Sequence, residues 1–508
     1  MISSFIHLLL AFILPASFIF FCRSVKRKEK SPSFHISLPK AYPLIGSYFS
    51  MKANQNNLIQ WLSHIIQLSP TATFTLHGPF ANRKVITGNP ANVHHILKTH
   101  FSNYQKGTTY THPLSDFLGA GILNVDGETW RFQRQLTIHE FTTKPLRKFV
   151  EHVVYAEISN RLIPILTSAA SEDKTLDFQD ILQRFTFDNI CKITIGFDPE
   201  DLTPSTERSK FVQAFDEATE ISGKRLQEPL PLIWKIKRVL NIGSEKRLKM
   251  AVSEVHQFVK KRVREKKREL KENSSLEYVD MLSRILISGN CDENVVTDRT
   301  ISFILAGKDS TSVALTWLFW LISKNPRVEK EIVKEIMEKP EDLVYDEVKE
   351  MVYTHAALCE SMRLYPPVPM DTKEAVNDDV LPDGTVVKKG TMMVYHVYAM
   401  GRMESIWGGD WREFRPERWL EKKVDESGKW RFLGRDCFCY PVFQAGPRVC
   451  LGKEMAFMQM KTLVAGILRR FRVVPAVAEG VDPPFISFLT SQMAGGFPVT
   501  IRQRFPSN

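Results

Sequence analysis

Cys450 lies in the segment with the clearest capacity for chemistry. The segment reads FQAGPRVCLG over residues 443–452, and a helical pattern follows it through Ala456, Met460, Leu463 and Ile467. This order delivers a sulfur to the start of a helix, where backbone N–H groups and the helix dipole favour the thiolate, the form that ligates iron. An isolated cysteine is usually a core thiol, but the surrounding decapeptide favours a metal ligand.

The residues around Cys450 suit a flat, acidic cofactor such as haem. Gly446 and Gly452 allow the backbone to turn and to approach the cofactor closely. Phe443 can shield the sulfur, and the guanidinium of Arg448 can meet an acidic haem edge. A thiolate ligand on haem iron favours cleavage of the oxygen–oxygen bond. We therefore predict a haem protein that activates dioxygen against an organic substrate.

A second polar cluster interrupts the apolar segment 299–323. Its centre reads Ala-Gly-Lys-Asp-Ser-Thr over residues 306–311. Because Lys308 and Asp309 would each cost about 2.5–3.5 kcal/mol in a membrane span, we predict a buried helix of the globule instead. The small residues at 306 and 307 leave room for dioxygen. The acid and the alcohols of Asp309, Ser310 and Thr311 can pass protons.

The elements that must position these residues are mainly helical. Helical patterns dominate from about residue 128 onward, whereas β-rich runs occur at 71–87, 376–394 and 485–501. Gly78 and Pro79 divide the first run as in a hairpin, and residues 382–384 read as a turn in the second. We therefore predict a helical body with small sheets at its side.

The segment 443–452 resembles the cysteine loop of the cytochrome P450 family, F-x-x-G-x-R-x-C-x-G. The fixed positions are all matched, by Phe443, Gly446, Arg448, Cys450 and Gly452. The resemblance covers nearly the whole chain. It implies a mainly α, triangular fold with a large helical domain and small β-sheets, and haem b between a long central helix and the cysteine loop. It also implies that Cys450 is the ligand of the haem iron.

Two further pairs of residues match motifs of the same family. Glu360 and Arg363 match E-x-x-R, and together with Arg418 of the later P-E-R segment they are implied to form a buried structural triad. Trp130 and Arg134 match W-x-x-x-R, whose members are implied to reach the haem propionates from one helix face. Taken alone, the pairs would indicate a surface ion pair and a core tryptophan beside an exposed arginine.

The segment 306–311 resembles the oxygen-activation motif of the family, A-G-x-D/E-T-T, with one departure. Ser310 stands at the position of the usual catalytic threonine. Serine keeps the hydroxyl but loses the methyl group that limits its rotamers. Thr311 lies about 100° further round the helix, so it could substitute only in a locally distorted helix. We favour Ser310 as the hydroxyl that acts with Asp309 and keep Thr311 as the alternative.

Three segments, 176–199, 228–238 and 440–461, are similar to plant microsomal fatty-acid omega-hydroxylases and to the related jasmonoyl-amino-acid hydroxylases. This resemblance implies hydroxylation of the terminal (omega) carbon of a fatty acid with dioxygen and electrons from NADPH, delivered by NADPH-cytochrome P450 reductase. Both substrate classes offer a carboxylate and an aliphatic end, so jasmonoyl-isoleucine is the alternative lipid carboxylate. Two other classes stay open, a reductase-independent enzyme that rearranges hydroperoxides and a non-enzymatic haem sensor.

The resemblance also implies which parts of the chain line the substrate cavity. By relative place in the fold these are residues 115–122, 211–232, 303–306, 368–371 and 489–495. Many of their side chains are apolar, as an acyl chain requires.

The formal net charge of +11 suits an anionic membrane or an acidic partner, and no zinc-finger or RNA-binding pattern supports nucleic acid. We expect the acidic reductase to dock on a basic surface around Arg448, Lys453 and Lys461. The basic stretch 244–271 has helical apolar spacing, so it reads first as a solvated helix face. Seven cysteines, an odd number, favour a reducing compartment, and the C-x-C at 437–439 lacks the second pair of a zinc site.

The amino terminus reads as a membrane anchor. Residues 2–22 carry no charge and are long enough for a helix that crosses a bilayer. Lysines and arginines follow at 23–30 and none precedes, so the positive-inside tendency places the rest of the chain in the cytoplasm. We predict a single-pass anchor in the endoplasmic reticulum membrane at 1–22, a basic, proline-containing hinge at 23–46 and a cytosolic haem-thiolate monooxygenase domain at 47–508. A cleaved signal peptide is the alternative.

Overall fold

In the computed structural model the chain divides into Met1–Leu38 and Pro39–Asn508. The structure describes residues 39–43, 45–78, 82–141, 143–203, 208–272, 280–287, 289, 292–341, 343–422, 430–477, 480 and 482–505. The predicted anchor at 1–22 and most of the predicted hinge at 23–46 lie outside the described residues, so both stay predictions. Within the described ranges, no helix combines the length and the apolar character needed to cross a membrane.

Helices dominate the described chain and confirm the predicted mainly α fold. The longer ones are α3 (Leu58–Leu68), α5 (Gly107–Leu118), α6 (Gly127–Phe141), α7 (Lys144–Glu157), α8 (Ile163–Ser171), α9 (Phe178–Ile195), α10 (Lys210–Gln227), α11 (Leu232–Leu240), α12 (Gly243–Glu272), α14 (Glu293–Lys324), α15 (Pro326–Met337), α17 (Val352–Leu364) and α20 (Lys453–Leu468). The shorter ones are α2 (Tyr48–Ala53), α4 (Pro90–His94), α13 (Met281–Ile287), α16 (Tyr345–Lys349), α18 (Val397–Met400) and α19 (Glu404–Trp407). The basic stretch at 244–271 lies in α12, where a buried stripe that includes Val255 and Val259 confirms the amphipathic helix.

The strands form small sheets, as predicted. One sheet has the order β1 (Thr73–His77), β2 (Arg83–Thr87), β8 (Met392–Tyr395), β5 (Asp371–Ala375), β3 (Tyr104–Gln105), and a second has the order β11 (Phe471–Pro475), β14 (Pro498–Gln503), β4 (Leu176–Asp177). The two-stranded sheets are β6 (Asp379–Val380) with β7 (Val386–Val387), β9 (Leu420–Lys422) with β10 (Trp430–Phe432), and β12 (Phe485–Ser487) with β13 (Ser491–Met493). The hairpin predicted at 71–87 is the antiparallel pair β1–β2, and the other two β-rich runs contain β6–β8 and β12–β14.

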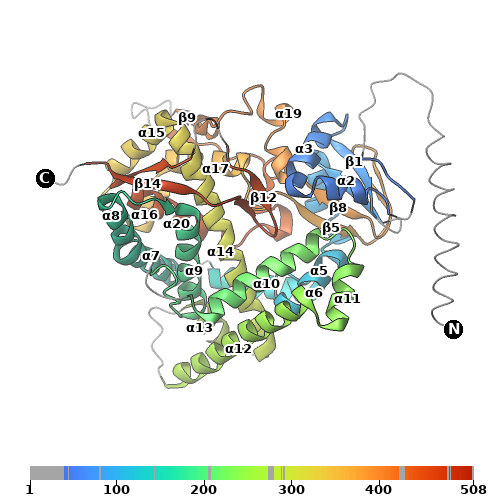
Figure 1. Cartoon of the computed structure of the whole chain (residues 1–508), viewed down its shortest axis with the longest axis horizontal. Helices are drawn as coiled ribbons and strands as arrows, with labels where there is room; N and C mark the ends of the chain where they lie inside the picture. Colours follow the sequence, from blue (N-terminus) through green and yellow to red (C-terminus); the bar gives the residue numbers. More distant parts are fainter. Residues whose placement is uncertain are drawn as a thin grey trace. The chain divides into compact units, whose positions relative to one another are not determined.

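Helix α14 is the predicted buried helix, and it runs through the middle of the described globule, where it packs on α9, α12 and α17 (Figure 1). The side chain of Asp292 accepts hydrogen bonds from the first turn and so caps the helix. The ammonium of Lys308 lies 2.7 Å from a carboxylate oxygen of Asp309 and 2.7 Å from one of Asp216 in α10. These ion pairs supply the partners that buried charges in the helix require.

A buried cluster around the carboxylate of Glu360 joins α17 to the segment that follows α19. Arg363 donates to it from Nε (2.8 Å) and Nη2 (2.7 Å), and Nε of Arg418 donates over 3.2 Å. The indole N–H of Trp419 donates over 2.9 Å. The side chains of Glu360 and Arg363 are 0% exposed. The structure thus brings the three residues of the predicted triad together in the core.

We expect Glu360→Gln to lower the free energy of unfolding by roughly 3–5 kcal/mol, because two buried arginines would lose their carboxylate. Urea denaturation followed by circular dichroism measures this loss. The matched control is Glu128→Gln, which breaks an exposed ion pair with Arg131 at the same i,i+3 spacing and is expected to cost at most about 1 kcal/mol. Equal losses in the two variants would contradict a structural role for the cluster.

Candidate active site

Cys450 lies in a loop that backbone hydrogen bonds hold in shape just before α20. Its N–H donates to the carbonyl of Phe443 (2.8 Å), and the N–H of Val449 donates to that of Gly446 (3.1 Å). Helix α20 begins three residues later, at Lys453. The Cys450 side chain is exposed, not covered by other side chains, and it lines a cavity inside the protein. The loop therefore presents the sulfur at a helix start, as the sequence predicts.

Opposing influences act on the pKa of the Cys450 thiol. Burial raises it, because the cavity separates the side chain from bulk solvent although part of its surface is open. The N–H groups of Gly452 and Lys453 and the charges of Arg134 and Lys453 lower it. For the polypeptide itself the pKa lies above the ordinary value. The helix start therefore lowers the pKa of the Cys450 thiol, as predicted, but burial raises that pKa by more.

Gly446 allows the backbone to turn, as predicted, and it also permits a close contact with a distant segment. Its φ is +64°, and a Cβ atom there would lie only 2.0 Å from the carbonyl oxygen of Leu97. Its lack of a side chain lets the loop pack on the chain at Leu97, and Gly446 is not among the residues that line the cavity, so its contact with a cofactor stays a prediction. Gly452 does line the cavity, and a Cβ atom there would meet only Phe141, at 3.9 Å.

A cavity of about 500 Å³ lies between the cysteine loop, α14 and the five-stranded sheet. The predicted site residues that line it are Trp130, Arg134, Ser310, Thr311, Phe443, Arg448, Cys450 and Gly452, together with Ala306 and Gly307. Asp309 is not among the lining residues. Each of the five ranges expected around the substrate contributes to the wall, for example through Ile122, Leu226, Phe303, Val368 and Leu489. The structure thus brings most of the predicted site together.

Basic side chains line the cavity beside the cysteine loop. Arg448 forms an ion pair with Asp126 (2.7 Å) and lies over the ring of Trp130, 4.4 Å from its centroid. Arg134 and Lys106 form no ion pair with a carboxylate in the described part of the chain, and burial lowers the pKa of both. Asp371 and Asp126 act on Lys106 from a distance, but neither cation forms an ion pair within the described chain, so the two fit the two propionates of haem b.

The residues present therefore fit haem: Cys450 would be the iron ligand, and Trp130, Arg134, Arg448 and Lys106 would lie along its acidic edge. When bound, the haem supplies a thiolate-ligated iron that activates dioxygen. Sequence reasoning missed Lys106, because a lone lysine after a short strand carries no pattern.

The sequence also gave no signal for a buried polar group behind this edge. The carboxylate of Asp371 in β5 accepts hydrogen bonds from Lys373 (2.8 Å), from the hydroxyl of Tyr395 (2.7 Å) and from the side-chain amide of Gln444 (3.0 Å). Gln444 lies in the cysteine loop, next to Phe443. Asp371 therefore ties the loop to the five-stranded sheet.

Ser310 and Thr311 both line the cavity, although α14 is continuous through this region. Thr311 therefore borders the cavity without a break in the helix, and the choice of Ser310 as the relay hydroxyl stays a prediction. The hydroxyl of Ser310 donates to the carbonyl of Ala306 (2.8 Å), which leaves its oxygen lone pairs for the cavity. Burial lowers the pKa of Lys308, but Asp309 and Asp216 outweigh that effect and raise it overall. Asp309 is thus held by a charged lysine behind the cavity wall.

The expected basic docking surface needs a correction. Lys461 is buried, and its ammonium donates to the carbonyls of Val348 (2.6 Å) and Met351 (3.3 Å). Burial lowers its pKa to about 8. Arg448 is occupied by Asp126, so Lys453 alone of the three expected residues is exposed. A surface that binds an acidic partner here has to use other cations.

Comparisons with known proteins agree with this geometry. A family model described as Cytochrome P450 matches residues 36–495. The chain is 69% identical over 469 residues to cytochrome P450 94A1 of Vicia sativa (92% of this chain, 91% of the relative) and 59% identical over 495 residues to cytochrome P450 94A2 of Vicia sativa (96% of each). It is 48% identical over 489 residues to cytochrome P450 94B1 of Arabidopsis thaliana (96% of this chain, 94% of the relative). The chain therefore belongs to the cytochrome P450 family and is a P450 monooxygenase.

Proposed function

We propose that this monooxygenase hydroxylates the terminal (omega) carbon of fatty acids, with dioxygen and with electrons from NADPH. The observation that carries the proposal is the composition of the cavity wall. Between the cysteine loop and the sheet the wall is mostly apolar, with Leu62, Leu76, Phe303 and Leu489 among its residues. Such a wall suits an aliphatic chain. NADPH-cytochrome P450 reductase is the proposed electron donor.

Strand β2 contributes one cation, Lys84, to the cavity wall. Its cross-strand neighbours Leu76 in β1 and Met392 in β8 also line the cavity, so Lys84 lies on the cavity side of the sheet. Burial lowers the pKa of Lys84, and no neighbouring charge contributes. A substrate carboxylate would supply the missing partner. With the carboxylate held at Lys84, the aliphatic end points toward the rest of the cavity.

Product identification tests the proposal. The full chain, loaded with haem and combined with the reductase and NADPH, is incubated with long-chain fatty acids and with jasmonoyl-isoleucine, and the products are identified by mass spectrometry. Omega-hydroxy fatty acids support the proposal, whereas hydroxylation of jasmonoyl-isoleucine alone favours hormone catabolism. Turnover of hydroperoxides without NADPH would favour the rearranging class of enzyme, and no turnover would favour a haem sensor. Cys450→Ser, which should lack the thiolate-haem absorption band in the presence of carbon monoxide, is the inactive control.

Lys84→Met is expected to raise KM for a free fatty acid about tenfold to a hundredfold, since a hydrogen bond to a charged group is worth roughly 1.5–3 kcal/mol. The KM for the methyl ester of the same acid should change little. Lys84→Arg keeps the cation and should keep the low KM for the acid. An equal rise for acid and ester would show that Lys84 only shapes the cavity.

The chain offers a route for protons to the oxygen side of the cavity. In the structure the hydroxyl hydrogen of Ser310 points to the carbonyl of Ala306, so the hydroxyl has to turn toward the cavity before it can donate its proton there. Asp309 follows directly behind the wall and is paired with Lys308, whose ammonium also reaches Asp216. We assign proton delivery to Ser310 and proton supply to Asp309.

If Ser310 delivers the proton, Ser310→Ala should consume NADPH but divert at least about nine-tenths of it to hydrogen peroxide, within the usual 10²–10⁴-fold scale of acid–base catalysis. Thr311→Ala is the matched control and should stay coupled. Asp309→Asn should slow the whole cycle. Product and peroxide are measured per NADPH for each variant. If only Thr311→Ala uncouples, the assignment moves to Thr311.

The reductase is expected to dock near the cysteine loop through cations that the structure leaves exposed. Lys453 at the start of α20 is one, and Lys144 and Lys148 of α7 are two others. Helices α7 and α20 lie against each other, and Arg147 forms an ion pair with Glu454 (3.4 Å). These lysines replace Lys461 and Arg448 in the proposed surface.

We place the catalytic domain on the cytosolic side of the endoplasmic reticulum membrane, anchored by residues 1–22. Helix α11 supports a second contact with the membrane surface. Ile236, Val239 and Leu240 are exposed, Val239 by 84%, and Lys235 and Lys237 flank Ile236. An exposed apolar face with interspersed lysines is typical of helices that lie in a membrane interface.

Removal of residues 1–30 should release most of the protein from membranes and leave haem binding intact. The truncated protein should still bind anionic lipid vesicles weakly, and Ile236→Glu with Val239→Glu should abolish that binding. The control pair, Met337→Glu with Val344→Glu, changes apolar residues that are also exposed elsewhere. Vesicle co-sedimentation measures each variant. Equal loss with the control pair would rule out α11 as the contact.

A further inference from the structure

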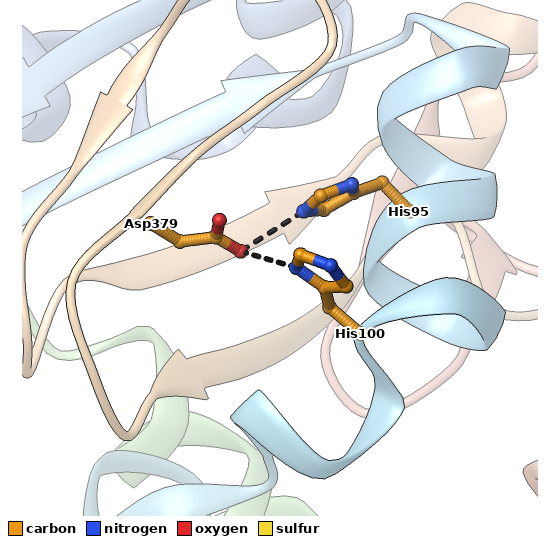
Figure 2. Close-up of side chains that lie close together, drawn as sticks. All are labelled: His95, His100 and Asp379. Carbon is orange, nitrogen blue, oxygen red and sulfur yellow. Dashed lines mark hydrogen bonds and ion pairs between the residues drawn. The ribbon is translucent and has the colours of Figure 1, made fainter.

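A second cluster of metal-binding residue types lies outside the catalytic cavity (Figure 2). Nε2 of His95 lies 2.9 Å and Nδ1 of His100 lies 3.0 Å from the same carboxylate oxygen, Oδ2 of Asp379. None of the three residues lines the cavity beside Cys450. The cluster therefore has no part in the reaction described above, and its chemistry needs a separate explanation.

The local backbone brings the two histidines together. Residues His95–Thr99 form a π-helical turn, and the N–H of His100 donates to the carbonyl of His95 (2.8 Å). Because this bond joins residues i and i+5, the two histidines lie one turn apart and their ring centroids are 4.0 Å apart. In an α-helix, residues five apart would face roughly 140° away from each other. The π turn therefore places two histidines that are five residues apart next to each other, so that both can bind one ion.

The carboxylate comes from a distant segment that is fixed in place. The N–H of Val380 donates to Oδ1 of Asp379 (2.8 Å), so the other oxygen is turned toward the histidines. The hydroxyl of Tyr104 donates to the same oxygen, Oδ2, over 2.8 Å. The N–H of Val376 donates to the carbonyl of Asn103 and the N–H of Asn377 to its side-chain oxygen, and these bonds hold the two segments side by side. The three potential ligand atoms are therefore close together before any ion arrives, and an ion that binds them would displace the hydrogens they share as protons to water.

The charge and exposure of the cluster suit a cation. Among the described residues, the ion-pair partners of Asp379 are the two histidines, and no lysine or arginine neutralises it. The side chains of His95 and Asp379 are only 12% and 13% exposed, whereas that of His100 is 47% exposed. The inner part is shielded, and His100 leaves a path for entry. A permanent positive charge is what this arrangement lacks.

We propose that His95, His100 and Asp379 bind a divalent transition-metal ion of the Zn²⁺ type. Two imidazole nitrogens and one carboxylate oxygen are ligands that Zn²⁺ takes at about 2.0–2.2 Å, and a water or the Tyr104 oxygen can complete a tetrahedron. Ca²⁺ and Mg²⁺ prefer sets made only of oxygen atoms, so they are poor candidates. The bound ion would join the π turn, against which Gly446 of the cysteine loop packs, to the β6–β7 hairpin.

Two substitutions separate a metal site from a purely hydrogen-bonded cluster. His100→Gln keeps a donor for the carboxylate of Asp379 but removes the imidazole ligand. Asp379→Asn keeps the size of the side chain but removes the charge. The matched control is His152→Ala, which removes an exposed histidine of α7 outside the cluster. His100 is itself half exposed, so His100→Gln should fold even if Asp379→Asn does not.

The experiment titrates Zn²⁺ into the haem-loaded full chain by calorimetry after treatment with a chelator, and Co²⁺ absorption reports the ligand geometry. The unchanged chain and His152→Ala should each bind one Zn²⁺ and show a tetrahedral Co²⁺ spectrum. His100→Gln and Asp379→Asn should bind at least about tenfold more weakly and lose that spectrum. Absence of binding in the unchanged chain, or equal affinity in all four proteins, would overturn the proposal and leave a hydrogen-bonded cluster only.

Discussion

The arrangement of the chain segments next to the cysteine loop depends on the buried carboxylate of Glu360. It accepts hydrogen bonds from Arg363, Arg418 and Trp419, and Arg363 in turn donates to the carbonyls of Trp411 (2.8 Å) and Glu413 (3.0 Å). Trp411 and Glu413 lie outside the helices and strands, so no helix or strand supplies donors for these carbonyls. The guanidinium therefore replaces the hydrogen bonds that a helix or strand would provide. One residue before Glu360, the carbonyl of Cys359 accepts from the hydroxyl of Tyr440 (2.8 Å), at the entrance to the cysteine loop.

Features with a local cause could be predicted from the sequence. The hairpin β1–β2 follows from two β-rich runs around Gly78, and α14 follows from its apolar length and its central charges. The residues gathered by the cysteine-loop motif also lie around one cavity, except Gly446. Its contact with Leu97 joins segments far apart in the chain, and such a contact leaves no local pattern. Burial of Lys308 requires acidic partners; Asp309 is its neighbour in the sequence, but only the fold identifies Asp216 as the second partner.

The error in the expected docking surface is clearest at Lys461. Lys461 follows the cysteine loop and has a charged side chain, so exposure is the natural expectation. It is buried because the carbonyls of Val348 and Met351 converge on its ammonium, and nothing in its own sequence announces them. The choice between Ser310 and Thr311 stays a prediction. The cavity wall covers enough of α14 to include both Ser310 and Thr311, so helix geometry alone cannot choose between the two hydroxyls.

The pairing of Arg448 with Asp126 leaves Arg134 and Lys106 as two cations at one cavity edge without a described acidic partner. In the polypeptide alone each of them loses hydration by burial and is repelled by Arg448, and both effects oppose folding. A dianionic cofactor removes that cost only in the folded state, so its binding energy adds to the stability of the native chain. Cofactor loading and folding are therefore thermodynamically coupled. The cell's supply of cofactor, as well as the sequence, sets how much of this protein persists in its native form.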